Sequence, residues 1–279
     1  MLRAEQRRVM HHGRDARGRA SGGWDARGLD GMTYCCGILV RDGIVMIADT
    51  RTNAGLDNIS TFRKLHVFSN PGERIMAVAS AGNLSLTQSV LSLLNEGLEN
   101  PETGERETLM NAPTMFQAAQ RIGRAIRALA HTEGPALEAA DVKFDLSFLF
   151  GGQIKGERLR LFMMYSAGNF IECTRDTPYL QIGEHKYGKP VLDRAITHDS
   201  DLYDALKVGL ISFDSTMRSN LSVGMPLDTL VVRRDACTAE LSYRIEPEEP
   251  YFQDLRRRWS AALRAAHLDI PRPPYLDRM

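Results

Sequence analysis

Short apolar runs separated by turn residues alternate along the chain with segments whose apolar residues recur every three to four positions. The runs Tyr34 to Val40 and Ile44 to Ala48 flank the tripeptide Arg41-Asp42-Gly43. An Asp-Gly pair between β-rich runs is a strong hairpin signal, because glycine adopts the positive φ that such turns need. The pattern therefore predicts a hairpin whose first strand follows Thr33 and whose second strand ends at Asp49.

Further apolar runs of similar length predict strands that short polar turns connect. They span residues 62–68, 74–80, 144–150, 159–165, 169–174, 179–182, 227–232 and 239–243. Strands joined by short turns indicate antiparallel sheets. Residues 51–60, which contain Gly and Asn, are interpreted as a polar loop.

Two segments with helical periodicity lie between these strands. Asn83 is a candidate cap for a helix that runs to about Glu99, and Thr114 is a candidate cap for a second one. Each segment places its apolar residues on one face, as an amphipathic helix does. We expect Gly134-Pro135 to end the second helix, since proline removes a backbone donor.

Three more helices are expected towards the C-terminus. They are residues 187–196, a longer helix capped by Asp199 or Ser200 and reaching Met217, and residues 251–267. Paired helices between runs of strands indicate outer layers. The predicted fold class is α+β: a four-layer αββα sandwich of two antiparallel sheets flanked by helices.

The first 32 residues differ in composition from the rest of the chain. Residues 1–32 are rich in Arg, Gly, Ala and His and nearly empty of large aliphatic side chains, so they cannot bury enough surface to order themselves. They are interpreted as a disordered extension, a propeptide or a stretch translated from a misplaced start, with Met32 as the alternative true start. Residues 33–250 are expected to form one domain, and residues 251–279 a helix followed by a Pro-rich tail.

Composition argues against several classes of function, among them nucleic-acid binding, membrane association and metal binding by cysteines. The formal net charge is +0, which gives no electrostatic case for binding nucleic acid or a membrane surface. No apolar run reaches the ~18 residues of a membrane helix, and the N-terminus lacks the apolar core of a secretory signal. The four cysteines lack metal-ligand spacing and are interpreted as buried free thiols. A cytoplasmic protein without metal or organic cofactor is expected.

The ends of the predicted hairpin carry candidate chemistry. If Thr33 became the first residue, its α-amine, with an unperturbed pKa of about 7.7–8.0, could take the proton from its own hydroxyl. Lys64 would lower the pKa of that amine, Asp49 would hold Lys64, and a backbone N–H of the Ala81-Gly82-Asn83 turn could stabilise an oxyanion. The residues alone also allow purely structural roles for these two side chains and for the turn. Asp49 could cap a turn, alternation with Phe62 favours a solvated Lys64, and Gly82 could serve the turn only.

Three segments of this sequence resemble a known family. They are TYCCGILVRDGIVMIADTRTNAG, FRKLHVF and ASAGNLSLTQSVL, and residues 32 to about 250 share the resemblance. They resemble the proteasome β-subunit superfamily of N-terminal-nucleophile hydrolases, and within it the bacterial proteasome-like Anbu (ancestral β-subunit) family most of all. The resemblance also implies the αββα sandwich.

The resemblance assigns roles to individual residues. It implies that Thr33 is the nucleophile, with Asp49 and Lys64 beside it and Lys64 on the third strand. It further implies that the Gly82 N–H forms the oxyanion hole and that Ser222 lies near the terminal amine. Proteasome β-subunits usually have an aspartate three residues before that serine, whereas this chain has Ser219.

The expected function is that of a threonine-type endopeptidase in a homo-oligomeric ring or helical assembly. Its substrates would be peptides or unfolded proteins, and the sequence leaves open whether an unfolding ATPase assists it. One alternative is an inactive proteasome-like scaffold in which Thr33 stays behind residues 1–32. Another is an amidase that acts on a small-molecule amide.

Overall fold

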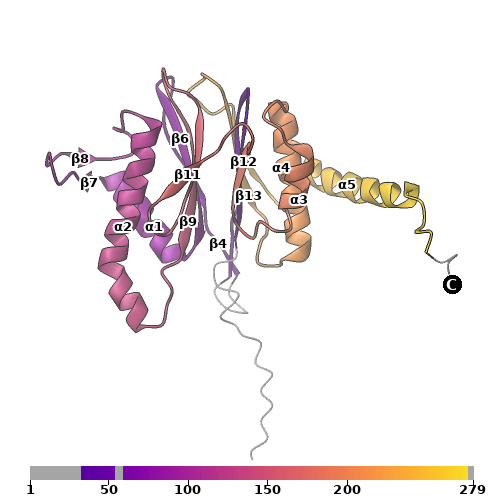
Figure 1. Ribbon diagram of the computed structural model, residues 1–279, viewed down its shortest axis with the longest axis horizontal. Helices are drawn as coiled ribbons and strands as arrows, with labels where there is room; N and C mark the ends of the chain where they lie inside the picture. The colour runs from indigo at the N-terminus through magenta and orange to yellow at the C-terminus, as the bar shows by residue number, and fades with distance from the viewer. Residues whose placement is uncertain (1–32, 54–58, 276–279) are drawn as a thin grey trace, which may run out of the picture.

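Two antiparallel five-stranded sheets pack face to face between outer helices (Figure 1). The computed structural model describes residues 33–53 and 59–275. One sheet has the strand order β12 (Tyr179–Gly183), β1 (Tyr34–Val40), β2 (Gly43–Asp49), β13 (Leu227–Arg233) and β14 (Leu241–Ile245). The other has the order β11 (Phe170–Glu172), β10 (Arg160–Met164), β9 (Leu146–Ile154), β6 (Arg74–Gly82) and β5 (Leu65–Asn70).

Helices cover the outer face of each sheet. The helices α1 (Leu84–Glu96) and α2 (Met115–Ala139) lie against the β5–β11 sheet, and α3 (Lys189–Ala195) and α4 (Leu202–Ser219) lie against the other (Figure 1). Apolar side chains fill three layers, one between the sheets and one beneath each helical layer. The predicted αββα sandwich is confirmed.

Strand β1 is buried on both faces, so its side chains divide between two of these layers. Cys36 and Ile38 pack beneath α3 and α4, whereas Cys35 packs between the sheets. The alternation follows from the two-residue period of a strand. All four cysteines are buried and free, as the sequence predicted.

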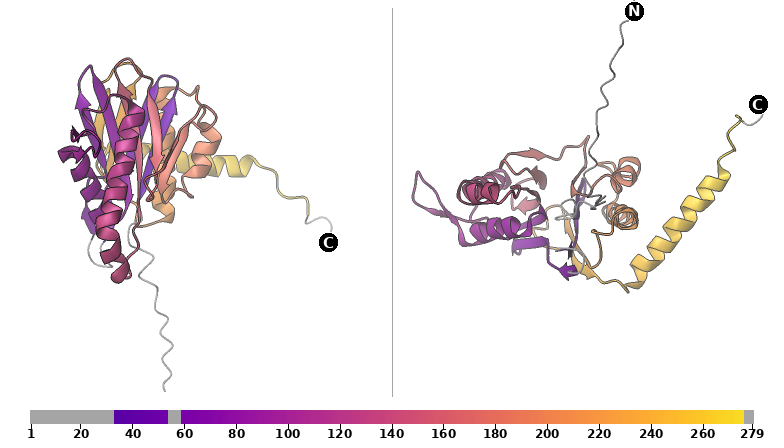
Figure 2. Two further views of the ribbon diagram at one scale, coloured as in Figure 1. Left: turned by 60° about the vertical axis from the view of Figure 1, so that its left-hand side comes forward. Right: turned by 90° about the horizontal axis from the view of Figure 1, so that it is seen from below.

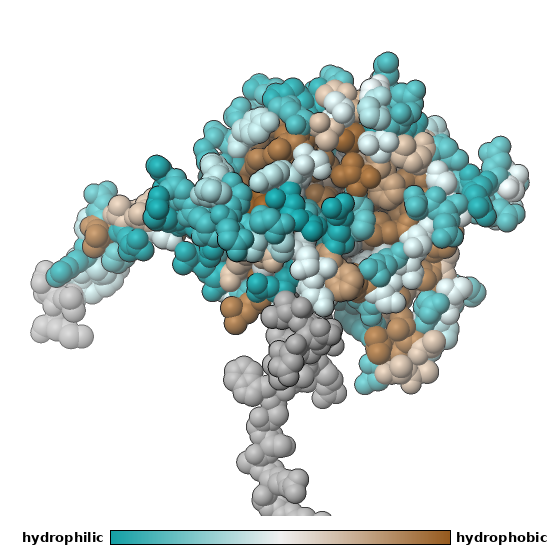
Figure 3. Space-filling model, turned by 180° about the vertical axis from the view of Figure 1, so that it is seen from behind, coloured by the Kyte–Doolittle hydropathy of each residue, from teal (hydrophilic) through white to brown (hydrophobic). Residues whose placement is uncertain are grey.

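Helix α5 (Pro250–Asp269) contacts the sandwich through its N-terminal half, as far as Ser260, whose Oγ accepts from Arg218 Nη2 over 3.1 Å. Figure 2 shows the rest of the helix extending away from the body. Phe252 and Leu255 are its buried residues. Arg256 Nε lies 2.7 Å from Oδ1 of Asp214, a fully buried carboxylate of α4, which anchors the base of α5. Hydrophilic residues cover much of α5 in Figure 3, while hydrophobic ones gather on the body.

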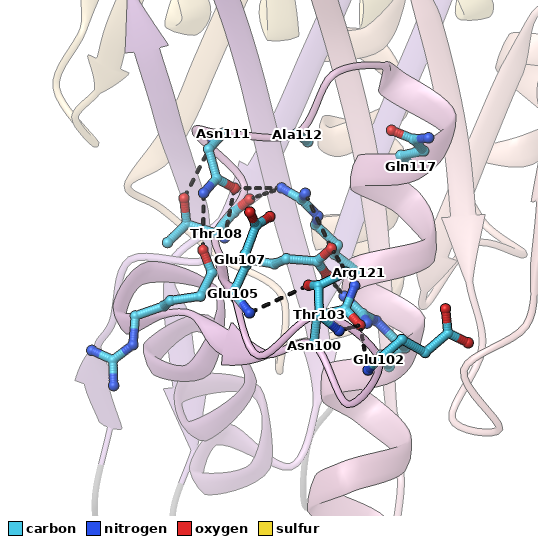
Figure 4. Close-up of polar contacts among 12 residues, drawn as sticks. Asn100, Glu102, Thr103, Glu105, Glu107, Thr108, Asn111, Ala112, Gln117 and Arg121 are labelled. Carbon is cyan, nitrogen blue, oxygen red and sulfur yellow. Dashed lines mark hydrogen bonds and ion pairs between the residues drawn. The ribbon is translucent and has the colours of Figure 1, made fainter.

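A small polar subdomain joins α1 to α2. The strands β7 (Leu98–Glu99) and β8 (Arg106–Glu107) form a hairpin beside α2. Arg121 of α2 donates from one guanidinium nitrogen to Thr108 O over 2.5 Å and to Asn111 Oδ1 over 2.6 Å (Figure 4). These bonds tie the connection to the helix.

Local signals placed most elements correctly, including both helix caps. The Asn83 side chain accepts from Leu86 N at the start of α1, and the Thr114 side chain accepts from Gln117 N at the start of α2. The expected cap of α4 was wrong, because Asp201 caps it, with Oδ1 accepting from Tyr203 N and Asp204 N. Helix α1 also ends at Glu96, before the expected Glu99. Gly97 follows it as the C-cap, with a φ of +94°.

Three further boundaries differ from the prediction. Helix α2 continues through Pro135 to Ala139, because most residues of its last turns are exposed and the carbonyl left without a partner N–H can bond to water. The polar loop after Asp49 contains two short paired strands, β3 (Arg51–Asn53) and β4 (Ile59–Thr61). The next strand, β5, begins at Leu65, so Phe62 to Lys64 lie outside it.

No helix in residues 33–53 and 59–275 is long and apolar enough to cross a membrane. Within the same ranges, no cluster of three or more His, Cys, Asp or Glu side chains could hold a metal ion. The interpretation of residues 1–32, including Met32, lies outside the described residues.

Candidate active site

Thr33 lies immediately before β1, and its backbone is held from the neighbouring strand. Its carbonyl oxygen accepts from Glu184 N over 2.7 Å. Gly183, which pairs with Tyr34, has a φ of +77°, and a Cβ built on it would lie 1.9 Å from the Thr33 carbonyl oxygen. Only glycine leaves room for this close approach, so the end of β12 positions the residue that begins β1.

Asp49 ends β2 beside Thr33 because the hairpin register brings the two ends together. Cys35 is opposite Ala48, so the residues just beyond them are neighbours. Asp49 Oδ1 accepts from Thr33 Oγ1 over 2.6 Å and from Tyr34 N over 3.2 Å. The carboxylate is fully buried.

Lys64 completes a three-residue cluster. Its Nζ lies 2.9 Å from Asp49 Oδ1, donates to Arg51 O over 2.6 Å, and contacts Thr33 Oγ1. Only 6% of Lys64 is exposed, so the solvated lysine expected from periodicity is wrong. The alternation rule fails because Lys64 precedes β5 instead of lying within it, which also corrects its expected place on a strand.

Burial and charge act in opposite directions on Asp49. Burial raises the pKa of this carboxyl above its ordinary value, while the Lys64 ammonium and the hydrogen bonds from Thr33, Lys64 and Tyr34 oppose the rise. An ion pair removed from water needs such partners to compensate its desolvation. The Thr33 hydroxyl therefore lies between an ammonium and a carboxylate, shielded from solvent.

Gly82 ends β6 at the strand-to-helix turn that leads into α1. Its φ is +101°, and a Cβ on it would meet Asp145 O at 2.6 Å, so the turn requires glycine. The Cys35 thiol lies 3.5 Å from Ser80 O, which brings this end of β6 close to the start of β1. Gly82 thus lies near the cluster, at its periphery.

Ser222 lies in the loop between α4 and β13, which we call the 220–225 loop. Only 4% of Ser222 is exposed, and its N–H donates to Asn220 Oδ1 over 2.9 Å. The loop reaches the cluster through Gly224, whose N–H lies 3.4 Å from Asp49 Oδ2. Ser219, which replaces the usual aspartate, is the last residue of α4.

Sequence reasoning missed the residues that support this cluster. Arg51, Gly183, Glu184 and Gly224 touch its members or the backbone beneath them. Each partner lies far away in the sequence, so no local pattern could have found them. The sequence indicated that the two glycines lie in turns, but it gave no sign of which residues they contact.

The cluster provides a hydroxyl, an ammonium and a carboxylate. Whether it also provides a general base depends on the Met32–Thr33 peptide bond. While Met32 is attached, the Thr33 nitrogen is an amide and cannot take a proton. Cleavage of that bond would place an amine on the residue that carries the hydroxyl. The arrangement is then suited to nucleophilic attack on a carbonyl.

A scan against protein-family models and a search of the curated proteins find no match. Solved structures do match. Anbu (ancestral beta-subunit) from Yersinia bercovieri is 47% identical, with a TM-score of 0.77, over 86% of this chain and 98% of that one. Anbu from Hyphomicrobium sp. strain MC1 is 49% identical, with a TM-score of 0.77, over 86% of this chain and 99% of that one.

A third structure, the helical assembly of the Anbu complex from Pseudomonas aeruginosa, is 45% identical with a TM-score of 0.80. The match covers 87% of this chain and 98% of that one. Identity of this size over nearly the whole length of the relatives agrees with the αββα architecture and with the segments that first suggested the resemblance. The chain belongs to the Anbu (ancestral β-subunit) family of proteasome-like proteins.

Proposed function

We propose that this protein is a cytoplasmic threonine-type endopeptidase whose nucleophile is Thr33. The observation that carries the proposal is the 2.6 Å hydrogen bond from Thr33 Oγ1 to Asp49 Oδ1, with Lys64 Nζ in contact with both side chains. The Thr33 hydroxyl is buried, so its hydrogen bonds are to Asp49 and Lys64, whereas an exposed hydroxyl could bond to water instead. Burying an ammonium and a carboxylate is costly, and a catalytic role accounts for keeping them together.

In the proposed reaction, Thr33 Oγ attacks the carbonyl carbon of a peptide bond while its own freed α-amine takes the hydroxyl proton. The Gly82 N–H donates to the oxygen that becomes negative. The protonated amine then gives its proton to the leaving nitrogen, and the C–N bond breaks. An ester joins the acyl group to Thr33.

Water completes the cycle. It attacks the ester carbonyl, the amine takes its proton, and the Thr33 oxygen leaves with a proton returned by the amine. Lys64 keeps the amine neutral through like-charge repulsion, Asp49 holds Lys64, and Ser222 is assigned a place beside the amine. These steps require that the Met32–Thr33 bond is hydrolysed, so that Thr33 is the first residue of the mature chain.

We further propose that the active form is a homo-oligomer that admits peptides or unfolded segments. The helical assembly described for the Pseudomonas aeruginosa relative supports this. Assembly around the sites would exclude folded proteins. Size measurement by light scattering across a concentration series tests it, and a monomer at all concentrations would contradict it.

Covalent labelling tests the nucleophile. A peptide vinyl sulfone should attach to the N-terminal peptide of the native protein, and Thr33→Ala should abolish the attachment. Ser92→Ala, which removes an exposed hydroxyl from α1, should leave it unchanged. Labelling of equal extent in Thr33→Ala would overturn the assignment.

The native N-terminus separates the enzyme from the scaffold alternative. Intact mass and N-terminal sequencing should give a chain that begins at Thr33. A chain that retains residue 32 and resists labelling would instead be the inactive scaffold. A peptide library compared with small-molecule amides then separates an endopeptidase from an amidase.

A further inference from the structure

Arg51 touches the candidate site in two ways from one residue. It is the first residue of β3, two positions after Asp49. Its backbone carbonyl accepts from Lys64 Nζ over 2.6 Å. Its guanidinium reaches the 220–225 loop, where Nη1 donates to Leu221 O over 2.9 Å.

Gly224 of the same loop lies directly against the Arg51 guanidinium. A Cβ built on Gly224 would meet three guanidinium atoms first, Cζ at 2.2 Å, Nε at 2.4 Å and Nη2 at 2.7 Å. The φ of Gly224 is outside the left-handed region, so its backbone conformation is open to other residues. The three nearest atoms that such a Cβ would meet therefore all belong to the arginine side chain.

The contact between the two residues bears on Asp49. The Gly224 N–H points at Asp49 Oδ2, at 3.4 Å, whereas Lys64 and Thr33 bind Oδ1. The loop that Arg51 holds thus supplies the contact to the second carboxylate oxygen. The same loop carries Ser222, which is buried.

We propose that Arg51 is a positioning residue that clamps the 220–225 loop against Asp49, and that Gly224 is glycine because the guanidinium lies on it. This inference rests on the proposed function for its catalytic consequence. The clamp keeps the Gly224 N–H on Asp49 and Ser222 beside the site. Because Lys64 binds the Arg51 carbonyl, a substitution at position 51 removes the clamp while leaving the Lys64 contact in place.

Two single variants test the clamp from opposite sides. Arg51→Met keeps an unbranched apolar stem without the donor, and Gly224→Ala pushes the guanidinium aside. Each should raise amide hydrogen exchange in the 220–225 loop by about tenfold or more, as expected when a hydrogen bond from a charged donor is lost. Unchanged exchange in both variants would overturn the proposal.

The double variant provides the decisive comparison. In an Arg51→Ala background the guanidinium is absent, so adding Gly224→Ala should change loop exchange by less than about twofold, within ordinary additivity error. If Gly224→Ala has the same effect with and without Arg51, the glycine serves the loop itself and the proposal fails. This cycle depends on non-additivity, which a general loss of stability would not produce.

Labelling kinetics supply the catalytic readout. With a peptide vinyl sulfone, Arg51→Met should lower the maximal inactivation rate about tenfold with little change in the concentration at half-saturation. Arg63→Met is the matched control, because the Arg63 side chain is 64% exposed and lies 3.9 Å from Asp228. It should leave both parameters unchanged. Equal losses in the two variants would show a charge effect and overturn the clamp.

Arg51→Lys separates geometry from charge. Lysine keeps the positive charge but lacks the planar group that lies on Gly224. It should behave like Arg51→Met, and full rescue would overturn the geometric proposal. If the wild type is not labelled at Thr33, the proposed function fails, while the exchange measurements still decide the clamp.

Discussion

Lys64 Nζ lies 2.9 Å from Asp49 Oδ1, and both side chains are buried. The pair joins two sheets, because Asp49 ends β2 and Lys64 leads into β5. Thr33 is its third member, so the packing of the sheets and the candidate chemistry depend on the same contacts. A change in this pair should therefore be visible in stability and in reactivity together.

Removing the ammonium alone should destabilise the fold. Lys64→Met leaves the Asp49 carboxylate buried without its countercharge, which should cost roughly 3–5 kcal/mol in the free energy of unfolding. Denaturant unfolding measures this cost. The double variant Asp49→Asn with Lys64→Met removes both charges and should recover part of the loss. A double variant that loses the sum of the two single losses would contradict this coupling.

The reactivity of Thr33 should fall at acidic pH above the range of an ordinary carboxyl. Burial raises the pKa of Asp49, so this group takes up a proton as pH falls before an ordinary aspartate near about 3.9 would. Once neutral, it no longer holds Lys64. The labelling rate as a function of pH should show this acidic limb.

Protonation of the Thr33 α-amine, the proposed base, lowers the rate in the wild type and in Asp49→Asn alike, whereas the further loss that comes from Asp49 should be absent in Asp49→Asn, which cannot take up the proton. Lys64, the Thr33 hydroxyl, the Cys35 thiol and the N–H groups of Tyr34 and Gly224 face Asp49. The two pH profiles, each divided by its own maximum, should therefore differ only where Asp49 takes up its proton. A difference between the two profiles confined to pH values at or below the ordinary aspartate pKa would contradict the direction of the shift.

Gly183→Ala should displace Thr33. The substitution forces an L side chain into a φ of +77° and places a Cβ 1.9 Å from the Thr33 carbonyl oxygen. Gly72→Ala is the matched control, since Gly72 has a φ of +81° and a Cβ added there would meet nothing within 4 Å. Both should lose roughly 1–3 kcal/mol from backbone strain, and Gly183→Ala should lose more.

Labelling distinguishes the two glycine variants further. Gly183→Ala should also lose vinyl sulfone labelling, because the Thr33 carbonyl can no longer accept from Glu184 N in the same position. Gly72→Ala should retain it. Equal stability and equal labelling in the two variants would show that the close approach to Thr33 is unimportant.

The cysteines should be inert while the chain is folded. Burial raises the pKa of the Cys173 thiol to about 12 and also raises the pKa of Cys35 and Cys36, so few thiolates exist at neutral pH. A thiol reagent should modify the cysteines only after unfolding. Ser92→Cys, at an exposed position of α1, is the positive control and should react at once. Rapid native modification of Cys35 would contradict this burial.

Local sequence was sufficient for the hairpin and the caps because their interactions are local. The Arg41-Asp42 turn joins β1 to β2, and Asn83 and Thr114 bond to backbone N–H groups three residues ahead. The two partners of each of these contacts lie within a few residues of each other in the sequence. The same is true of the apolar runs that form both sheets. The positive φ expected of Gly43 was wrong, because Gly43 begins β2, where a Cβ would meet Val232 O at 2.5 Å.

Lys64 shows where this reasoning failed. Periodicity with Phe62 predicted a solvated side chain, whereas the resemblance to the proteasome superfamily predicted a place beside Thr33, where the structure locates it. Periodicity applies only inside a strand, and β5 begins one residue later. Where a strand begins depends on its partners, here β6, and not on its own residues.

The sequence by itself determined the αββα sandwich, the hairpin that presents Thr33 and Asp49, and the helices that cover the sheets. Only the tertiary structure decided that Gly183 leaves room for the Thr33 carbonyl and that Arg51 lies on Gly224. The physical reason is distance along the chain. Steric fit between residues more than a hundred positions apart exists only after the two sheets have packed.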